Sequence, residues 1–505
     1  MTQANVKNIL IVGGGTAGWM TANLLNHHWR KYGIQVTLVE SPEIGIIGVG
    51  EGSTPKLKDF FETLEIPEEE WMPACHATYK NGITFKNWST VPGYTSYFHP
   101  FGCTLDTMTY PIFRDHTILR RKGVDVDVSP DRYFLMSKLV QNHMAPKAPA
   151  NFPFQFDYSY HFDSVLVGQF LRDKAIERGV KHITGTVTEV QQHESGDISQ
   201  IVLADQSVLA ADVFVDCTGF ASLLTSKTLQ VPFVSFADSL FNDRAIAIPT
   251  PITEEIPVTT ESTAMKHGWA WKIPLTNRYG NGYVYSAAHC SPDEAETELR
   301  SHLGLLDDAT EARHLRMRVG RAERGWEKNC VAIGLSQGFI EPLEATAIQF
   351  IHSSVELFIK AFEQGEFTPQ YQSQYNDKIN QNYAGILDYI VLHYQTNSRQ
   401  DTDYWIENRN NPHISSNLAT IIESWHQVHN LEAVLQQLNV SEYYSPLSWN
   451  SMFAGTGSFA SAATLPPPTQ YHRDQQRLDE FFAGCMLNFK HHRELLEQLP
   501  LKNCA

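Results

Sequence analysis

A glycine-rich turn near the start of the chain has the residue types and spacing of a dinucleotide site. Gly13, Gly15 and Gly18 form a G-x-G-x-x-G pattern directly after the apolar run 9–12. Glycines at these places allow a tight turn, room for a pyrophosphate against bare backbone, and close packing of helix on strand. Glu40 follows Gly18 by 22 positions and ends a second apolar run, close to the roughly 20 positions expected for an acid that binds a ribose hydroxyl. The turn therefore predicts FAD or NAD rather than NADP, without deciding between the first two.

Outside this turn, the side chains that could do chemistry have no equally clear pattern around them. Lys80, judged by its neighbours alone, is more simply a surface lysine, and Glu344 is more simply a carboxylate stabilised at a helix start. Trp269 and Trp271 are more simply core aromatics. The seven cysteines are scattered without a C-x-x-C pair, and the paired histidines lack ligand spacing. We therefore expect reduced thiols and no metal site.

The elements that would position these residues follow from the apolar patterns. Short apolar or alternating runs predict strands, and longer runs with apolar residues three and four apart predict helices. The expected strands are 9–12, 34–39, 79–88, 180–190, 211–219, 268–275 and 329–339. The expected helices are 56–64, 160–179, 341–364, much of the chain after 369, and a final helix over 473–499. This order predicts an α/β fold with α+β elements.

The composition limits the kinds of partner. The chain has 505 residues, 42% of them hydrophobic, which is enough for a sizeable core. Its net charge of −17 argues against nucleic acid and anionic membrane surfaces as partners. No apolar run approaches the roughly 20 residues that a membrane-spanning helix needs, and no secretory leader precedes the first strand. We therefore expect a cytoplasmic enzyme, and the sequence leaves open whether it forms a homodimer.

Several segments, in order along residues 1 to about 460, together resemble the flavin-dependent halogenases of the tryptophan and indole type. The matching segments are G-G-G-T-A-G-W from Gly13, I-G-V-G-E-G-S-T from Ile47, Y-K-N-G-I-T-F-K-N-W from Tyr79, Y-H-F-D from Tyr160, V-D-C-T-G from Val215, W-A-W-K-I-P from Trp269, I-E-P-L-E-A-T-A from Ile340, and a long run from Ile390. The resemblance implies a G-x-G-x-x-G FAD-binding fold of the monooxygenase type with a C-terminal helical module. Residues 1–350 would form the FAD-binding module, interleaved with a substrate-side sheet, and 351–505 a mainly helical substrate or cap module.

The resemblance also implies an activity. Members of the family take FADH2 from a separate flavin reductase and use it, with O2 and bromide or chloride, to make hypohalous acid. This acid reaches a lysine beside a small, electron-rich aromatic substrate, and the motifs place the lysine at Lys80 and its partner acid at Glu344. The residue types suit the reaction, because a buried amine with a lowered pKa can hold or react with hypohalous acid. A carboxylate can stabilise the positive ring and then remove its proton.

Further roles carry over from the family motifs, residue by residue. The implied contacts are Gly13, Gly15, Thr16, Ala17, Gly18, Glu40, Glu51, Val187, Leu335 and Ile348 for FAD, the backbone amides of Thr346 and Ala347 for the halide, and His99, Phe101 and Trp449 for the substrate. Trp269 and Trp271 would mark the wall between flavin and substrate. Val187 and Leu335 are equally explained as core residues, and His99 as a buried structural histidine.

Two departures from the family pattern bear on specificity. The family commonly has E-S-T-G or E-S-T-S where this chain has E-A-T-A from Glu344, so a serine hydroxyl is missing and the choice of halide stays open. The stretch 443–457 keeps a tyrosine pair and Trp449, but it lacks the longer lid whose acid and aromatics would clamp an amino acid. We therefore expect a more open pocket that accepts indole or an indole derivative rather than free tryptophan.

Two other functions compete with this hypothesis. A flavin-dependent aromatic hydroxylase would transfer oxygen directly and would not need Lys80, and the Trp269 and Trp271 pair argues against it. A non-catalytic flavoprotein would turn over no arene at all. The mass of the product separates these alternatives, because a halogenase adds bromine or chlorine and a hydroxylase adds oxygen.

Overall fold

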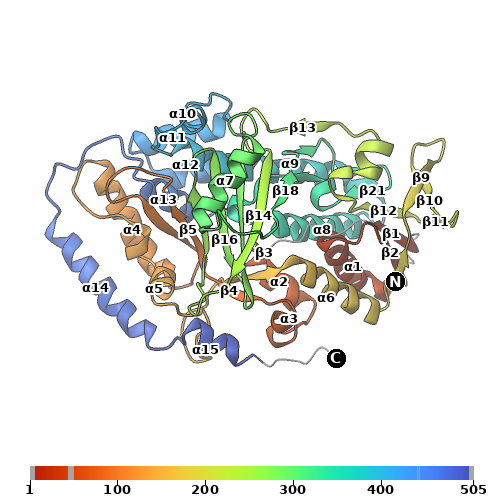
Figure 1. The fold of residues 1–505 in the computed structure, drawn as a ribbon, viewed down its shortest axis with the longest axis horizontal. Coiled ribbons are helices and arrows are strands. Elements are labelled where there is room, and N and C mark those ends of the chain that lie inside the picture. The colour runs from red at the N-terminus through yellow and green to blue at the C-terminus, as the bar shows by residue number, and fades with distance from the viewer. Residues whose placement is uncertain (1–5, 44–49, 441, 443, 500–505) are drawn as a thin grey trace.

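The glycine turn follows an inner strand of a six-stranded sheet. The computed structural model describes residues 6–43, 50–440, 442 and 444–499, and Figure 1 shows the path of the chain. The strands are β1 (Asn8–Val12), β2 (Gln35–Glu40), β8 (Lys181–Thr184), β12 (Val213–Asp216), β20 (Trp326–Glu327) and β21 (Cys330–Ala332). Their order is β20-β21-β12-β1-β2-β8, and every neighbouring pair except β20–β21 is parallel. Parallel strands are usually covered on both faces, which explains why the run 9–12 is buried throughout.

A second sheet of seven strands occupies the middle of the molecule (Figure 1). Its strands are β5 (Gly82–Lys86), β6 (Ser96–Pro100), β14 (Arg244–Pro251), β15 (Thr260–Ala264), β16 (Gly268–Pro274), β17 (Arg278–Tyr285) and β18 (Arg313–Arg316). Their order is β18-β14-β17-β16-β15-β5-β6, and β15–β5 is the parallel pair in an otherwise antiparallel sheet. The predicted strand 268–275 is β16, which carries the tryptophan pair.

Three small sheets complete the strand content of the described residues. The first contains β3 (Gly50–Gly52), β4 (Thr78–Lys80) and β7 (Ser159–Asp163), in the order β3-β7-β4. The second contains β9 (Val187–Gln192), β10 (Ile198–Leu203) and β11 (Val208–Ala210). The third contains β13 (Phe233–Ser235), β19 (Gly320–Ala322) and β22 (Gly338–Phe339). The expected strands 180–190 and 329–339 are therefore each divided between two sheets.

The single strand expected over 79–88 is also two strands in different sheets. β4 ends at Lys80 and β5 begins at Gly82, and between them the Asn81 N–H donates to Val258 O at 2.8 Å. The alternation of side chains continues through Asn81, so the sequence pattern did not reveal the change of sheet. As a result, Lys80 is the last residue of a short strand that lies against the larger sheet.

The helices pack around these sheets. They are α1 (Thr16–Trp29), α2 (Lys56–Thr63), α3 (Glu68–Ala74), α4 (Asp106–Arg121), α5 (Leu135–Gln141), α6 (Ser164–Glu177), α7 (Pro292–Leu303), α8 (Ala347–Gln364), α9 (Gln372–Gln395), α10 (Asp403–Arg409), α11 (Ser416–His426), α12 (Leu431–Gln437), α13 (Pro446–Gly455), α14 (Thr469–Met486) and α15 (His492–Glu497). In Figure 1, α14 runs along the left edge and α15 lies beneath the middle of the molecule. α1 packs between α6 and α8 beside the six-stranded sheet.

Three of the expected helices differ from the observed ones. The helix expected over 160–179 starts at Ser164 as α6, because residues 159–163 form β7. The helix expected from Glu341 starts later, at Ala347, because Ala345 has a left-handed conformation with φ of 56°. A short 3₁₀ turn, Pro342–Glu344, precedes it. The final helix expected over 473–499 is two helices: α14 ends at Met486 and α15 begins at His492.

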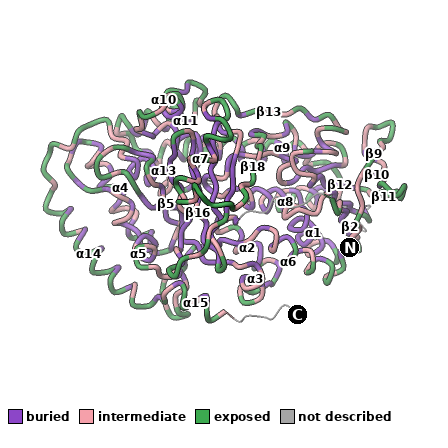
Figure 2. The backbone as a smooth tube through the Cα atoms, in the orientation of Figure 1, coloured by how far each residue is buried: buried purple, intermediate pink, exposed green. Residues whose placement is uncertain are grey.

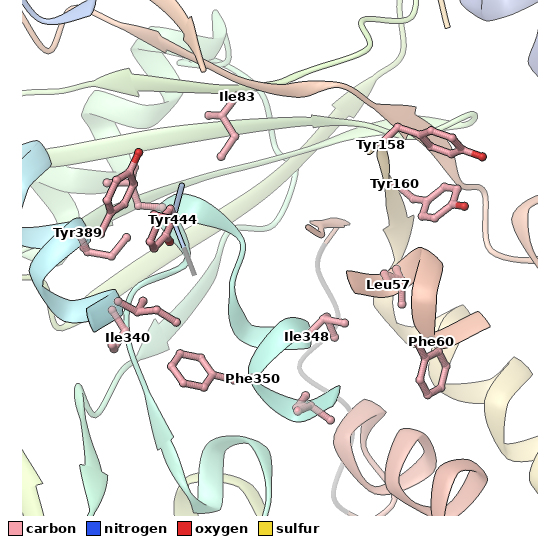
Figure 3. Packing of buried hydrophobic residues seen from close by; sticks show 14 of the residues in the cluster. Leu57, Phe60, Ile83, Tyr158, Tyr160, Ile340, Ile348, Phe350, Tyr389 and Tyr444 are labelled. Atoms are coloured by element: carbon pink, nitrogen blue, oxygen red, sulfur yellow. The ribbon is translucent and has the colours of Figure 1, made fainter. Parts of the chain in front are cut away.

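One large hydrophobic cluster contains residues from both predicted modules, 1–350 and 351–505. Its members include Ile9 in β1 and Leu496 in α15, and Figure 2 shows the buried backbone concentrated where the sheets meet α1, α8 and α13. Figure 3 shows part of this cluster, with Ile348 and Phe350 of α8 lying between the Tyr389–Tyr444 pair and the helix that carries Leu57 and Phe60. The division between 1–350 and 351–505 stays a prediction. Within the described residues, no helix is long and apolar enough to cross a membrane.

Candidate active site

The predicted dinucleotide turn has the geometry that its glycines imply. Gly13 has φ of 113°, and a Cβ there would lie 2.2 Å from Cys217 O. A Cβ on Gly18 would lie 1.9 Å from Gly13 O, so neither position admits a side chain. By contrast, none of the described atoms comes within 4 Å of a Cβ built on Gly15, which precedes Thr16 at the start of α1. Open space at a helix N-terminus fits the pyrophosphate of FAD.

Glu40 ends β2 beside the same turn. A Cβ on Gly14 would lie 1.6 Å from Glu40 Oε2, so this carboxylate rests directly on the bare backbone of the glycine turn. Its other oxygen, Oε1, lies 2.8 Å from His182 Nε2 on β8. The carboxylate is half-buried and held in place, as an acid that binds a ribose hydroxyl must be. Its contact with FAD stays a prediction.

The remaining residues expected to contact FAD lie in four different elements. Glu51 lies in β3, where burial raises its pKa to about 7 despite a hydrogen bond from Ser164 that lowers it. Leu335 lies in a turn whose Gly334 would, with a Cβ, come within 2.7 Å of Ala17 Cβ, so this turn packs on the first residues of α1. The first three residues of the I-G-V-G-E-G-S-T segment, 47–49, lie outside the described residues.

Ile348 and Val187 differ in how closely they approach the glycine turn. Ile348 is buried in the first turn of α8, which packs on α1. Val187 begins β9 in a separate sheet and packs, half-buried, against the cluster that contains Leu10 and Val12. A contact between its backbone and FAD stays a prediction, since packing alone also explains Val187.

Lys80 is buried at the end of β4. Its Nζ donates a hydrogen bond to Ser53 O at 3.0 Å and lies 5.3 Å from the centre of the Phe101 ring. A Cβ on Gly52 would lie 3.2 Å from the same Nζ. Burial lowers the pKa of Lys80 to about 7, although the negative charge of Glu344 raises it. The structure therefore brings Lys80 and Phe101 together and leaves much of the amine neutral near pH 7.

Glu344 lies in the 3₁₀ turn before α8 and is buried among histidines. Its Oε1 accepts a hydrogen bond from His393 Nε2 at 2.8 Å and lies 3.4 Å from His99 Nδ1. Burial by itself would raise the pKa of Glu344, but His99 and His393 more than offset this and hold that pKa well below its usual range. Glu344 is therefore an ionised, hydrogen-bonded carboxylate in the interior.

Helix α9 holds both glutamates of the E-P-L-E turn through two consecutive residues. His393 bonds Glu344, and the Tyr394 hydroxyl donates to Glu341. Glu341 also accepts from Asn242 Nδ2 at 2.8 Å, and burial raises its pKa to about 7. The turn that carries Glu344 is thus anchored at both ends by buried hydrogen bonds, which limits how far the carboxylate can move.

The residues expected to hold a halide lie where the chain enters α8. The left-handed Ala345 separates Glu344 from Thr346, and α8 then begins at Ala347 without a side-chain cap. The first amides of a helix have no partner within the helix, and the helix dipole favours an anion there. The amides of Thr346 and Ala347 can therefore serve an anion, whereas the hydroxyl that a serine would bring is absent at Ala345.

An aromatic group joins Trp449 to the histidine beside Glu344. The ring of Tyr389 stacks on Tyr444 with centroids 3.5 Å apart, and its edge meets Trp449 at 4.9 Å. The Tyr389 hydroxyl lies 3.5 Å from His99 Nε2. The stretch after residue 443 therefore packs on α9, and Trp449 is connected to the site through Tyr389. Tyr443 lies outside the described residues.

The tryptophan pair lies in the sheet next to Lys80. Trp269 and Trp271 on β16 are buried, with ring centroids 6.2 Å apart. A Cβ on Gly282 would lie 2.1 Å from the Trp271 ring, so this ring covers the bare backbone of β17. Further along β17, Gly280 packs on Gly50 of β3, where a Cβ would lie 2.9 Å from the Gly50 Cα. The two sheets are therefore in direct backbone contact.

Three residues of α9 belong to the site although the sequence did not single them out. His393, Tyr389 and Tyr394 contact Glu344, His99 and Glu341, respectively. All three lie in or next to the run from Ile390 that contributed to the family resemblance, and that resemblance was the signal that could have found them. Over the residues that the structure describes, no group of three His, Cys, Asp or Glu side chains could hold a metal ion.

Comparison with known proteins gives one consistent result. The family model described as tryptophan halogenase matches residues 8–466. Tryptophan 6-halogenase SttH from Streptomyces toxytricini is 40% identical over 91% of each chain, and tryptophan 7-halogenase RebH from Lentzea aerocolonigenes is 33% identical over 98% of this chain and 97% of its own. The solved structure of BrvH, a flavin-dependent halogenase from Brevundimonas sp. BAL3, matches with a TM-score of 0.85 at 32% identity, over 98% of this chain and 99% of that one.

Proposed function

Because the chain belongs to the tryptophan halogenase family, we propose that it uses FADH2, O2 and a halide to halogenate an indole ring through Lys80 and Glu344. The observation that carries this proposal is a buried amine, Lys80, that interacts electrostatically with a buried carboxylate, Glu344. Lys80 has a lowered pKa and Glu344 stays ionised, so that each has the protonation state the reaction needs near neutral pH.

The glycine turn fits FAD, and each neighbouring group has a defined task. Bound as FADH2, the cofactor supplies with O2 the oxidant that converts halide into hypohalous acid. The open space at Gly15, the N-terminus of α1 and Glu40 would hold its pyrophosphate and ribose. The amides of Thr346 and Ala347 would hold the halide at the start of α8. Trp269 and Trp271 would keep substrate away from the flavin side.

Lys80 would receive hypohalous acid and present its halogen to the ring. The hydrogen bond to Ser53 O fixes Nζ, and the Phe101 face beside it offers a stacking surface for an arene. Electrophilic attack places positive charge on the ring. Glu344 would stabilise that charge and then take the ring proton, while His99 and His393 hold the carboxylate in place.

Two indolic substrates are candidates, and different observations favour each. The names of SttH and RebH state tryptophan as the substrate of those proteins, which favours free tryptophan here. The shortened stretch after residue 443 lacks the acid and aromatics that would clamp an amino acid, which favours indole or a substituted indole. The ratio of kcat/KM for indole to that for tryptophan separates the two, and efficient use of tryptophan with poor use of indole would reject the second.

The proposal is tested by supplying the protein with FADH2, O2, both halides and a panel of arenes, and reading product masses. We propose that a separate flavin reductase provides FADH2 in the cell, so that any reductase can serve in the assay. A gain of bromine or chlorine by the wild type and no product with Lys80→Met is the expected result. A gain of oxygen would identify a hydroxylase instead, and no turnover of any arene would indicate a non-catalytic flavoprotein.

A further inference from the structure

The imidazole of His492 occupies an unexpected place beside the strand that carries Lys80. His492 begins α15, is fully buried, and lies beyond the residues that the family model matches. Its Nε2 accepts the backbone N–H of Tyr79 at 3.1 Å, and its Nδ1 donates to Ile256 O at 2.9 Å. One side chain therefore links two backbone segments that are remote from it in sequence.

These two segments are otherwise paired as neighbouring parallel strands. Thr260 pairs with Ile83 in the β15–β5 ladder, and one rung earlier the Asn81 N–H bonds Val258 O directly. Both pairs have a sequence offset of 177 residues. The same offset would pair Tyr79 with Ile256, and at this rung the imidazole stands between the N–H and the carbonyl. His492 thus takes the place of one backbone hydrogen bond in the ladder.

The inserted ring determines how far β4 lies from the segment that contains Ile256. A direct hydrogen bond would bring Tyr79 and Ile256 to the usual strand spacing, about 4.8 Å, whereas a ring that bonds both groups must hold them further apart. β4 then pairs on its other edge with β7, where Lys80 is opposite Ser159. This arrangement places Nζ next to Ser53 O and Phe101.

We propose that His492 is a positioning residue for Lys80, inserted into the ladder between Tyr79 and Ile256 so that β4 holds the amine at the reaction site. The proposal rests on the proposed function for its catalytic consequence. The required state of the ring is consistent with its surroundings, because burial lowers the pKa of His492 to about 4 and one nitrogen must stay unprotonated to accept from Tyr79.

Backbone hydrogen bonds at the start of α15 hold His492 next to the segment 143–145. The His492 N–H donates to His143 O at 2.8 Å, and Ala145 N–H donates to Lys490 O at 3.0 Å. Met144 O, between them, lies 3.4 Å from Asn81 Nδ2. The segment 143–145 therefore lies between α15 and the end of β4, and it keeps His492 in its place.

Two substitutions of His492 test whether its hydrogen bonds or its volume matter. His492→Phe keeps an aromatic ring at this position and removes both hydrogen bonds. His492→Gln keeps an acceptor near the position of Nε2. A displacement of about 1 Å in a catalytic group can cost about 100-fold, so we expect kcat for arene halogenation to fall about 10- to 100-fold in His492→Phe. KM for the arene should change little, and His492→Gln should recover much of the loss.

A second measurement separates positioning from general stability. If Lys80 is misplaced, hypohalous acid should still form and be caught by an added chemical trap, so the ratio of arene product to trapped acid should fall. His116→Phe is the matched control, because His116 lies in α4, is buried, and bonds Tyr133 and Asp474 of α14. His116→Phe should destabilise the C-terminal region and leave this ratio unchanged.

The pKa of the Lys80 amine provides a readout that does not depend on halogenation. The charged groups that affect it are Glu344 and, when protonated, His161. Reductive methylation followed across pH should give a higher Lys80 pKa in His492→Phe than in the wild type, because a displaced strand admits water and favours the charged amine. An unchanged pKa together with an unchanged product ratio would overturn the proposal, as would equal losses in His492→Phe and His492→Gln. Failure of the wild type to halogenate any arene would instead reject the proposed function.

Discussion

Lys80→Met is expected to make the protein more stable at pH 6 while abolishing halogenation. Burial lowers the pKa of Lys80 from 10.5 to about 7. Each pKa unit corresponds to about 1.4 kcal/mol, so the charged amine costs the folded state on the order of 5 kcal/mol below pH 7. Methionine fills a similar volume and removes this cost. Loss of the hydrogen bond from Nζ to Ser53 O reduces the stabilisation by about 1–2 kcal/mol.

The sign of the pH dependence follows from the protons bound in each state. Between pH 7 and 10.5 the unfolded chain keeps a proton that folded Lys80 has lost, so the free energy of unfolding of the wild type rises with pH across this window. The gain from Lys80→Met is therefore largest at or below pH 7, about 3–4 kcal/mol. It shrinks as the pH rises and becomes a small loss near pH 10.

The assay is the melting temperature of both proteins at pH 6 and pH 10. An unfolding entropy of about 2.1 cal/mol/K per residue makes 1 kcal/mol equal to about 1 °C for a chain of this length, so we expect a rise of about 3–4 °C at pH 6 and none at pH 10. Lys86→Met is the matched control, because Lys86 pairs with Glu261 at 2.8 Å on the surface and should change stability by less than about 1 kcal/mol at either pH. A Lys80→Met protein that melts no higher than wild type at pH 6, or gains equally at both pH values, would refute the reasoning.

Three further predictions concern other parts of the site. Glu344→Gln should lower kcat for halogenation about 100-fold or more with little change in FAD binding, since it removes the base and the ring-stabilising charge; it should also lower the pKa of Lys80, which labelling across pH would measure. His393→Phe should raise the pKa of Glu344 by removing a hydrogen bond to the charged form. Because Glu344 acts as an ionised base with a pKa well below 4.5, activity should be lost at a higher pH than in the wild type as the pH falls. A kcat profile from pH 3 to 7 that matches the wild type would contradict this. Gly18→Ala should weaken FAD binding or prevent folding, because its Cβ would lie 1.9 Å from Gly13 O; a titration showing wild-type affinity would contradict it.

Local features could be predicted from the sequence, and features that depend on distant contacts could not. Gly13 and Gly15 lie between a strand and a helix as predicted, and Gly18 lies in the first turn of that helix, because the roles of these glycines depend on steric limits within a few residues. The break at Ala345 was missed, since alanine gives no signal of a left-handed conformation. The long helix was therefore expected to begin six residues too early.

The site illustrates the same limit. The family motifs named Lys80, Glu344 and His99; the structure places His99 3.4 Å from Glu344, and the charge of Glu344 acts on Lys80. The roles assigned to them stay predictions. His393 and His492 were not singled out because nothing in their own neighbourhood marks them. His393 matters through a glutamate 49 positions away, and His492 through a backbone amide 413 positions away.

The large sequence separation between His492 and its two hydrogen-bond partners has a consequence for how the protein is made. A ribosome adds Tyr79 and Ile256 long before residue 492, and N-terminal parts of a chain can fold while synthesis continues. The rung between Tyr79 and Ile256 is therefore incomplete in every nascent chain that has not yet received His492. If the imidazole positions Lys80 as proposed, a partly synthesised chain that already holds its flavin would still lack an ordered acceptor for hypohalous acid. The enzyme would then be able to deliver hypohalous acid to its substrate only after residue 492 has been added, and not as soon as the six-stranded sheet has folded.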